Sequence, residues 1–108
     1  MKKKPIPEDI KEEALRTIER FNTTKLKGTG CAFVARFQGR FLYLDRDELG
    51  RVGPICRLDY LGGKQGWGFA IYKYSTERYD PGERWFPGFG LLDGTILGAM
   101  KAGMMAYQ

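Results

Sequence analysis

The stretch from Cys31 to Ser75 constrains the fold most, because it holds four runs of aromatic and aliphatic residues joined by short glycine-containing segments. Runs of this composition between turn residues are typical of β-strands. The rest of the chain lacks this pattern and reads as helix or loop packed on it. The stretch therefore predicts a four-stranded, mostly antiparallel β-meander at the centre of the chain.

The first two runs are separated only by Gln38 and Gly39. A two-residue connection that ends in glycine favours a type I′ hairpin turn, and this register pairs Phe37 with Arg40. Side chains alternate between the two faces of a strand. One face then carries an apolar set that we expect to face the core: Phe33, Ala35, Phe37, Leu42 and Leu44.

The second hairpin consists of residues 55–61 and 66–74. Its alternation puts a second apolar set on the core face: Cys56, Leu58, Tyr60, Trp67, Phe69 and Ile71. The polar, glycine-rich segment from Asp47 to Pro54 predicts a loop that joins the two hairpins. A register error of one residue in either hairpin would exchange its two faces.

The opposite side of this sheet combines aromatic rings with guanidinium groups. Six residues are expected there: Arg36, Phe41, Tyr43, Arg57, Tyr72 and Tyr74. Tyrosine and phenylalanine rings on a strand surface can stack nucleobases, and neighbouring arginines can hold phosphates. The set predicts binding of single-stranded DNA or RNA, provided that neither a helix nor a second subunit covers this side of the sheet.

A helix is expected on each side of the meander in the sequence. Residues 8–21 place apolar side chains at helical spacing and acidic ones in the first turns, where the helix dipole favours them. Asp93 suits the N-cap of a final helix over residues 94–107. Residues 1–7 are expected to form a flexible tail, and residues 8–108 a single α+β domain with the element order α-β-β-β-β-α.

The final helix carries a stripe of small residues, and the loop before it is rich in aromatic residues. Glycines inside a helix cost about 1 kcal/mol each relative to alanine, so close approach of another backbone would offset them. That partner could be the sheet, the first helix or the same helix of a second subunit. A self-association or protein-interaction role would use six residues: Trp85, Phe86, Phe89, Gly94, Gly98 and Ala102.

The sequence contains no histidine, which removes the commonest general base and transition-metal ligand. Nucleophile-elbow, phosphate-loop and dinucleotide-binding motifs are also missing from it. The two cysteines, Cys31 and Cys56, are too few for a structural zinc site and read as free thiols. No catalytic residue, cofactor or metal is therefore predicted, and a small binding module is favoured over an enzyme.

The charge of the chain is uneven. The formal net charge of +5 divides into +2 in residues 1–25, +4 in residues 26–78 and −1 in residues 79–108. This balance favours an anionic partner only weakly, because such a charge also keeps a protein soluble. No window is long and apolar enough to span a bilayer, and no apolar segment follows the N-terminal lysines to make a signal peptide. The sequence predicts a cytoplasmic protein that does not contact membranes.

Overall fold

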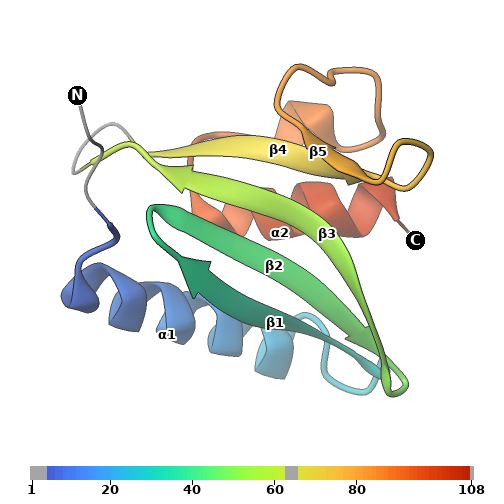
Figure 1. Cartoon of the computed structure of the whole chain (residues 1–108). Helices are drawn as coiled ribbons and strands as arrows, with labels where there is room; N and C mark the ends of the chain where they lie inside the picture. The colour runs from blue at the N-terminus through green and yellow to red at the C-terminus, as the bar shows by residue number, and fades with distance from the viewer. Residues whose placement is uncertain (1–4, 63–65, 108) are drawn as a thin grey trace.

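The computed structural model of the chain describes residues 5–62 and 66–107. Its elements are, in order, α1 (Glu8–Thr24), β1 (Cys31–Gln38), β2 (Phe41–Glu48), β3 (Arg51–Tyr60), β4 (Trp67–Lys73), β5 (Arg78–Asp80), the short 3₁₀ helix η2 (Phe89–Leu91) and α2 (Ile96–Ala106). The five strands form one antiparallel sheet in sequence order (Figure 1). The α+β class and the meander are confirmed, and β5 adds a fifth strand to the four predicted.

The β1–β2 hairpin differs from the prediction in its register. Gln38 pairs with Phe41, so Gly39 and Arg40 form the turn in place of Gln38 and Gly39. Gly39 has a φ of +60°, and a type II′ turn places glycine in this conformation at its first central position. The true register is displaced by two residues from the predicted one, which leaves every side chain on its predicted face.

β2 and β3 form a long hairpin where the sequence predicted a loop. The segment from Asp47 to Pro54 is paired apart from the turn residues Leu49 and Gly50. Both have positive φ, +55° and +94°, as a type I′ turn requires, although leucine rarely adopts this conformation. The Asp47 carboxylate accepts a 2.8 Å hydrogen bond from the Gly50 N–H, and the Leu49 N–H donates to Gly30 O at 2.9 Å. These two bonds stabilise the turn.

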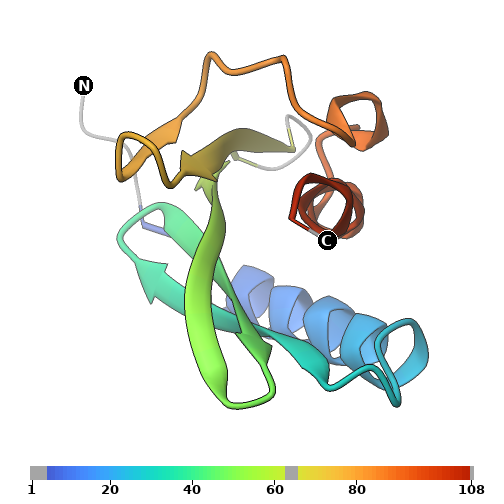
Figure 2. The same ribbon diagram turned by 90° about the vertical axis from the view of Figure 1, so that its right-hand side faces the viewer.

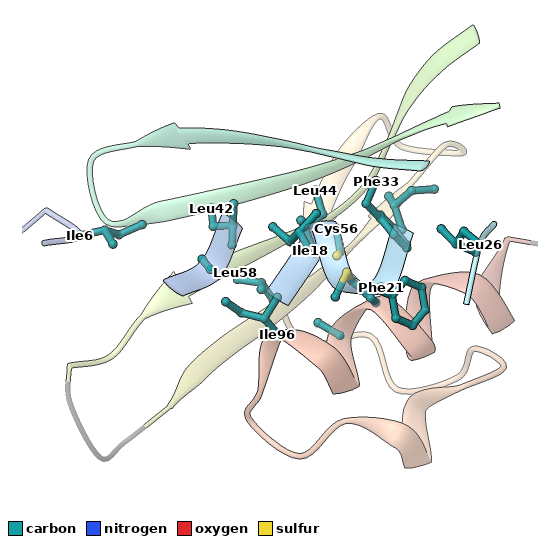
Figure 3. Packing of buried hydrophobic residues seen from close by; sticks show 14 residues of the cluster. Ile6, Ile18, Phe21, Leu26, Phe33, Leu42, Leu44, Cys56, Leu58 and Ile96 are labelled. Atoms are coloured by element: carbon teal, nitrogen blue, oxygen red, sulfur yellow. The ribbon is translucent and has the colours of Figure 1, made fainter. Parts of the chain in front are cut away.

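The inner face of the sheet, which we define as the side that both helices cover, carries the predicted apolar residues. Leu42, Leu44 and Leu58 are 0–1% exposed. Figure 3 shows their side chains gathered with Ile18 of α1 and Ile96 of α2, and all five belong to one core cluster. The core-face prediction is therefore confirmed for these strands.

A β-bulge in β3 changes which side chains reach the core. Leu44 pairs with Cys56, but Asp45 pairs with Pro54, so Ile55 is the extra residue. Ile55 and Cys56 are both buried although they are neighbours in a strand, because a bulge interrupts the alternation of side chains. Strict alternation with Cys56 predicts that Ile55 points away from the core, and the bulge makes that prediction wrong.

α1 is three residues longer than predicted and also covers the edge of the sheet. It continues through Asn22, Thr23 and Thr24, and both threonine hydroxyls donate to the Arg20 carbonyl. The Asn22 side-chain amide binds the backbone N–H and C=O of Phe33 on the edge strand β1, at 2.8 and 3.0 Å. These edge groups are thereby satisfied and do not recruit another strand.

α2 begins two residues later than predicted, and its N-cap is Thr95 instead of Asp93. The Thr95 hydroxyl accepts a 3.0 Å hydrogen bond from the Gly98 N–H. Asp93 Oδ1 accepts from the N–H and the hydroxyl of Thr95, at 3.0 and 2.5 Å, and so orients the capping residue. Gly94 has a φ of +85° and lies outside the helix.

The small residues of α2 allow close packing within the chain. A Cβ on Gly98 would lie 2.8 Å from the backbone oxygen of Leu91, and a Cβ on Gly103 would lie 2.7 Å from Cγ2 of Ile55. Ala102 is completely buried, with its backbone oxygen against Gly88 in the loop before η2. Of the partners considered from the sequence, the chain itself supplies the close approach, through β3 and the loop before the helix.

β5 lies in the segment that the sequence predicted to be irregular. Tyr79 of β5 pairs with Tyr72 of β4. In Figure 2, β3 links the lower β1–β2 hairpin to the upper pair of β4 and β5, and the following segment arches across to η2 beside α2. This path brings the aromatic loop alongside the last helix.

Part of the expected flexible tail is packed against the domain. Ile6 is 3% exposed and joins the core cluster, and its N–H donates to Gly39 O at 3.1 Å. Residues 1–4 of the expected tail lie outside the described residues. Within the described part of the chain, neither helix has the length and apolar character needed to cross a membrane.

Candidate nucleic-acid interface

The outer face of the sheet, opposite the helices, brings the predicted nucleic-acid-binding residues together. Arg36 lies on β1, Phe41 and Tyr43 on β2, Arg57 on β3 and Tyr72 on β4, and the pairing of Arg36 with Tyr43 and of Tyr43 with Arg57 puts them on one side. Tyr74 follows the end of β4 and its ring contacts Tyr72. Both helices pack on the inner face, and Tyr107, just after α2, reaches this set at Tyr74.

The rings form a continuous row across the outer face. Ring centroids are 6.2 Å apart for Phe41 and Tyr43, 5.3 Å for Tyr43 and Tyr79, 5.0 Å for Tyr79 and Tyr72, and 4.9 Å for Tyr72 and Tyr74. Most of these contacts are edge-to-face, the geometry that the ring quadrupoles favour. The row is therefore a packed cluster in which each ring supports the next.

The outer face is concave, because the sheet curls at its β5 edge. Tyr43 of β2 and Tyr79 of β5 are in ring contact, although β3 and β4 separate their strands in the sheet. Ala70 of β4, which pairs with Arg57 and so faces the same side, is only 3% exposed. A flat sheet of four strands would leave Ala70 open to solvent.

Arg36 is held by a buried carboxylate. Its Nε lies 2.6 Å from Asp45 Oδ2 and its Nη2 lies 3.2 Å from Oδ1, a bidentate arrangement that is among the stronger ion pairs. Asp45 is only 7% exposed. The hydrogen bond to Asp45 raises the pKa of the Arg36 guanidinium, which also lies 4.7 Å from the centre of the Tyr43 ring.

Arg57 has a different environment. Its guanidinium carbon lies 4.5 Å from the centre of the Phe41 ring and 5.5 Å from that of Tyr79, and cation–π attraction holds it there. Among the described residues, no carboxylate lies within ion-pair distance of Arg57. Arg40, by contrast, contacts Phe41 but also pairs with Asp59 at 2.8 Å. Of these three guanidinium groups, Arg57 is the one whose charge no carboxylate of the described residues offsets at ion-pair distance.

Tyr74 is the most exposed ring of the row, at 52%. Its hydroxyl donates to Pro54 O at 2.8 Å, and its ring contacts Tyr107 after α2 at 5.4 Å. The Tyr107 hydroxyl in turn donates to Tyr72 O, and the buried Arg46 donates to Tyr107 O. The end of α2 thus fixes Tyr74 in position while leaving much of its ring in solvent.

Burial raises the pKa of the hydroxyls of Tyr74, Tyr79 and Tyr107. The cause is the cost of moving a phenolate out of water. For Tyr79 the neighbouring Arg36 opposes this effect without overcoming it. The three hydroxyls remain protonated at neutral pH.

The residues predicted for self-association are divided between surface and interior. Trp85 is 95% exposed and Phe89 is 40% exposed, whereas the Phe86 ring stacks on Phe69 at 5.9 Å. Gly98 and Ala102 are buried within the chain, and Gly94 lies in the loop before α2. The predicted small-residue stripe is thus not a surface, while the aromatic loop remains one.

Tyr79 is a member of the outer face that the sequence pattern did not predict. The local signal is the alternation in Arg78–Asp80, which follows the four turn-like residues 74–77, with Glu77 at a φ of +54°. A three-residue strand is too short to stand out from a loop by periodicity. Its position over Tyr43 comes from the curl of the sheet, which no local pattern encodes.

The described residues do not gather into a metal site, since no group of three or more histidine, cysteine, aspartate or glutamate side chains is found among them. Cys31 and Cys56 are free thiols, and burial raises the pKa of Cys56, so this cysteine is a poor nucleophile. Beside its rings and guanidinium groups, the described outer face holds the carboxylates of Asp45 and Asp59, each paired with an arginine. No protein-family model matches the chain, and neither a curated protein nor a solved structure does.

Proposed function

We propose that the protein is a non-enzymatic module that binds single-stranded nucleic acid on the outer face of its sheet. The observation that carries the proposal is Arg57, a guanidinium set among aromatic rings with no carboxylate at ion-pair distance in the described residues. Such a group can bind a phosphate without first giving up an ion pair. The uncovered position of the ring row supports the same use.

The geometry favours weak binding with few phosphates. Asp45 and Asp59 offset the charges of Arg36 and Arg40, so we expect about one or two phosphates to be neutralised, with a slope of log K against log salt of about −0.7 to −1.4. Tyr74 is the ring with most surface available for a base, because its neighbours are half-buried. Ring stacking of this kind is worth about 1–3 kcal/mol per base.

The test is a fluorescence-anisotropy titration with labelled, mixed-sequence single-stranded DNA and RNA at low salt. Arg57→Ala should weaken binding and flatten the salt slope by about one phosphate. Arg16→Ala, which removes the same charge from an exposed position on α1, is the matched control and should have the smaller effect. Absence of binding by the unmodified protein at about 100 μM would end the proposal, because non-specific sites usually reach that range.

A second candidate function is self-association through the aromatic loop. Trp85 is 95% exposed, which is unusual for the largest apolar side chain, and Phe89, Leu91 and Met105 nearby are 40–43% exposed. Sedimentation at micromolar to high micromolar concentration tests it. A concentration-dependent dimer that Trp85→Ser abolishes supports this function, and a clean monomer contradicts it.

A cytoplasmic location belongs with either proposal. Both cysteines are unpaired, which is the usual state in a reducing compartment. Fractionation of cells that express the protein tests the location directly, and recovery with membranes or in the medium would contradict it.

A further inference from the structure

A groove opens on the helix side of the sheet, where α1 passes the beginning of α2. Its volume is about 510 Å³, within the range of small-molecule sites. Six residues give it its chemistry: Glu13, Thr17, Tyr60, Trp67, Asp93 and Thr95. The groove lies across the sheet from the ring row, so it is separate from the surface for which we propose nucleic-acid binding.

The wall formed by β3 and β4 is aromatic and well supported. The rings of Tyr60 and Trp67 lie 5.3 Å apart at an angle of 54°. The backbone N–H of Trp67 donates to the backbone oxygen of Gly94 at 2.9 Å. A Cβ on Gly66 would come within 2.8 Å of that same oxygen. The backbone before β4 is therefore pressed against the backbone before α2, and this contact fixes the position of Trp67.

The groove is negative in a protein that is positive overall. The described residues that line the groove include two carboxylates, Glu13 and Asp93, and neither a lysine nor an arginine. The whole chain, by contrast, carries a net charge of +5. The beginning of α2 contributes about half a unit of positive charge, which two carboxylates outweigh. Hydrogen bonds from Thr95 lower the pKa of Asp93, so its carboxylate is charged at neutral pH.

We propose that this groove binds a small organic cation that carries a flat apolar body, such as an arylalkylamine. The aromatic part would lie against Trp67 and the apolar residues Ile10, Ala14 and Leu97. The carboxylates of Glu13 and Asp93 would attract the ammonium, and so would the ring of Trp67, since tryptophan is the strongest of the aromatic partners for a cation. The two carboxylates would disfavour an anion with the same apolar body.

The experiment compares two probes with the same indole ring and opposite charge, tryptamine and indole-3-propionate. In ¹H–¹⁵N spectra of the whole chain, tryptamine should move the Trp67 indole N–H and the Gly94 and Gly66 amides, with a dissociation constant on the order of millimolar, as expected for a probe of this size. Indole-3-propionate should bind at least fivefold more weakly. The indole N–H of Trp85, which is 95% exposed, is an internal control and should not follow the titration.

Two matched variants locate the charge. Glu13→Gln should weaken tryptamine about two- to fivefold, the range for one solvent-exposed ion pair, and leave indole-3-propionate no weaker. Glu12→Gln removes the same charge one residue away, on an exposed position that does not line the groove, and should change neither probe. Glu13 is exposed on α1, so both variants should fold, and identical far-UV spectra check this.

Three results would overturn the proposal. The first is no saturable movement of the Trp67 signals by about 10 mM tryptamine. The second is equal affinity for the amine and the anion, since the groove would then select only an apolar ring. The third is an equal loss from Glu12→Gln and Glu13→Gln, which would place the effect in the general field of α1. None of these results depends on whether the outer face binds nucleic acid.

Discussion

The two faces of this sheet come from alternate residues of the same strands, yet they carry different kinds of side chain. On the inner face, aliphatic side chains such as Leu42, Leu44 and Leu58 are removed from water entirely. On the outer face, rings and guanidiniums contact one another and keep part of their surface exposed. The inner face supplies stability through burial, and the outer face is left with polar groups and ring edges that can contact a ligand.

Aromatic and charged side chains suit this second arrangement for a physical reason. A tyrosine ring can pack against a neighbour and still present its hydroxyl to water. An arginine covers a ring with its guanidinium while remaining hydrated. Because such contacts are partly solvent-screened, each should stabilise the fold less than an inner-face leucine. Substitutions on the inner face should therefore cost more stability than substitutions on the outer face.

Leu58→Ala should lower the free energy of unfolding by about 2–5 kcal/mol, because it removes a side chain that is 1% exposed and leaves a cavity between sheet and helices. Val34→Ala on the outer side, where Val34 is 40% exposed, is the control and should stay within about 0.5 kcal/mol. Urea denaturation of both variants gives the values. Equal losses would contradict the division of roles between the faces.

Gly98→Ala should cost about 1–3 kcal/mol, because the added Cβ would lie 2.8 Å from the backbone oxygen of Leu91, and a backbone atom cannot move aside as a flexible side chain does. On helix propensity alone the same change would stabilise the helix by up to about 1 kcal/mol. The sign of the measured change in unfolding free energy therefore shows whether the steric clash or the propensity is larger. Thermal or urea unfolding measures it, with Leu97→Ala on the exposed side of α2 as control. A stabilised Gly98→Ala would mean that the loop is not packed on α2.

Asp45→Asn should cost about 1 kcal/mol in stability. The change leaves Arg36 without its ionised bidentate partner, but the Arg36 side chain is 52% exposed and water compensates for much of the loss. If the outer face binds single strands, the same variant should bind them more tightly and with a salt slope steeper by about one phosphate, because Arg36 is then free to bind one. Tighter binding combined with lower stability is the signature to look for in paired anisotropy and urea titrations. Weaker binding would indicate that Asp45 positions Arg36 for its ligand.

The sequence predicted the composition of the two faces well, and the reason lies in the period of a strand. An error of two residues in the β1–β2 register leaves Phe33 inside and Arg36 outside, so alternation survives an error in the turn. The bulge at Ile55 could not be predicted in this way, because it breaks the period itself. The Leu49–Gly50 turn was missed because it needs leucine at positive φ, against the preference of that residue.

The sequence predicted which residues lie on the outer face better than it predicted how their side chains contact one another. The predicted residues that lie on strands do share one side, but the ion pairs there, Arg36 with Asp45 and Arg40 with Asp59, depend on cross-strand neighbours and therefore on the correct register. The contact of Tyr79 with Tyr43 depends on the curvature of the whole sheet. Curvature is the sum of twist, bulge and packing on the inner face, so local sequence carries little of it.

The smallest predicted effect concerns the tyrosines, and it distinguishes a packed ring row from a loose one. Burial raises the pKa of Tyr74, Tyr79 and Tyr107 in the folded protein above the ordinary value of 10.0. Below about pH 10 all three are protonated in both states, so stability does not depend on them. As the pH rises past that value, the unfolded chain loses these protons first, and the free energy of unfolding should fall until the folded pKa values are passed.

Absorbance of tyrosinate near 295 nm follows the protons directly. In the native protein part of the signal from the six tyrosines should appear only above the pH at which the urea-unfolded chain titrates. If instead all six tyrosines titrate as in the unfolded chain, water reaches their hydroxyls freely. The ring row would then be loosely packed, with its rings available for stacking on a base.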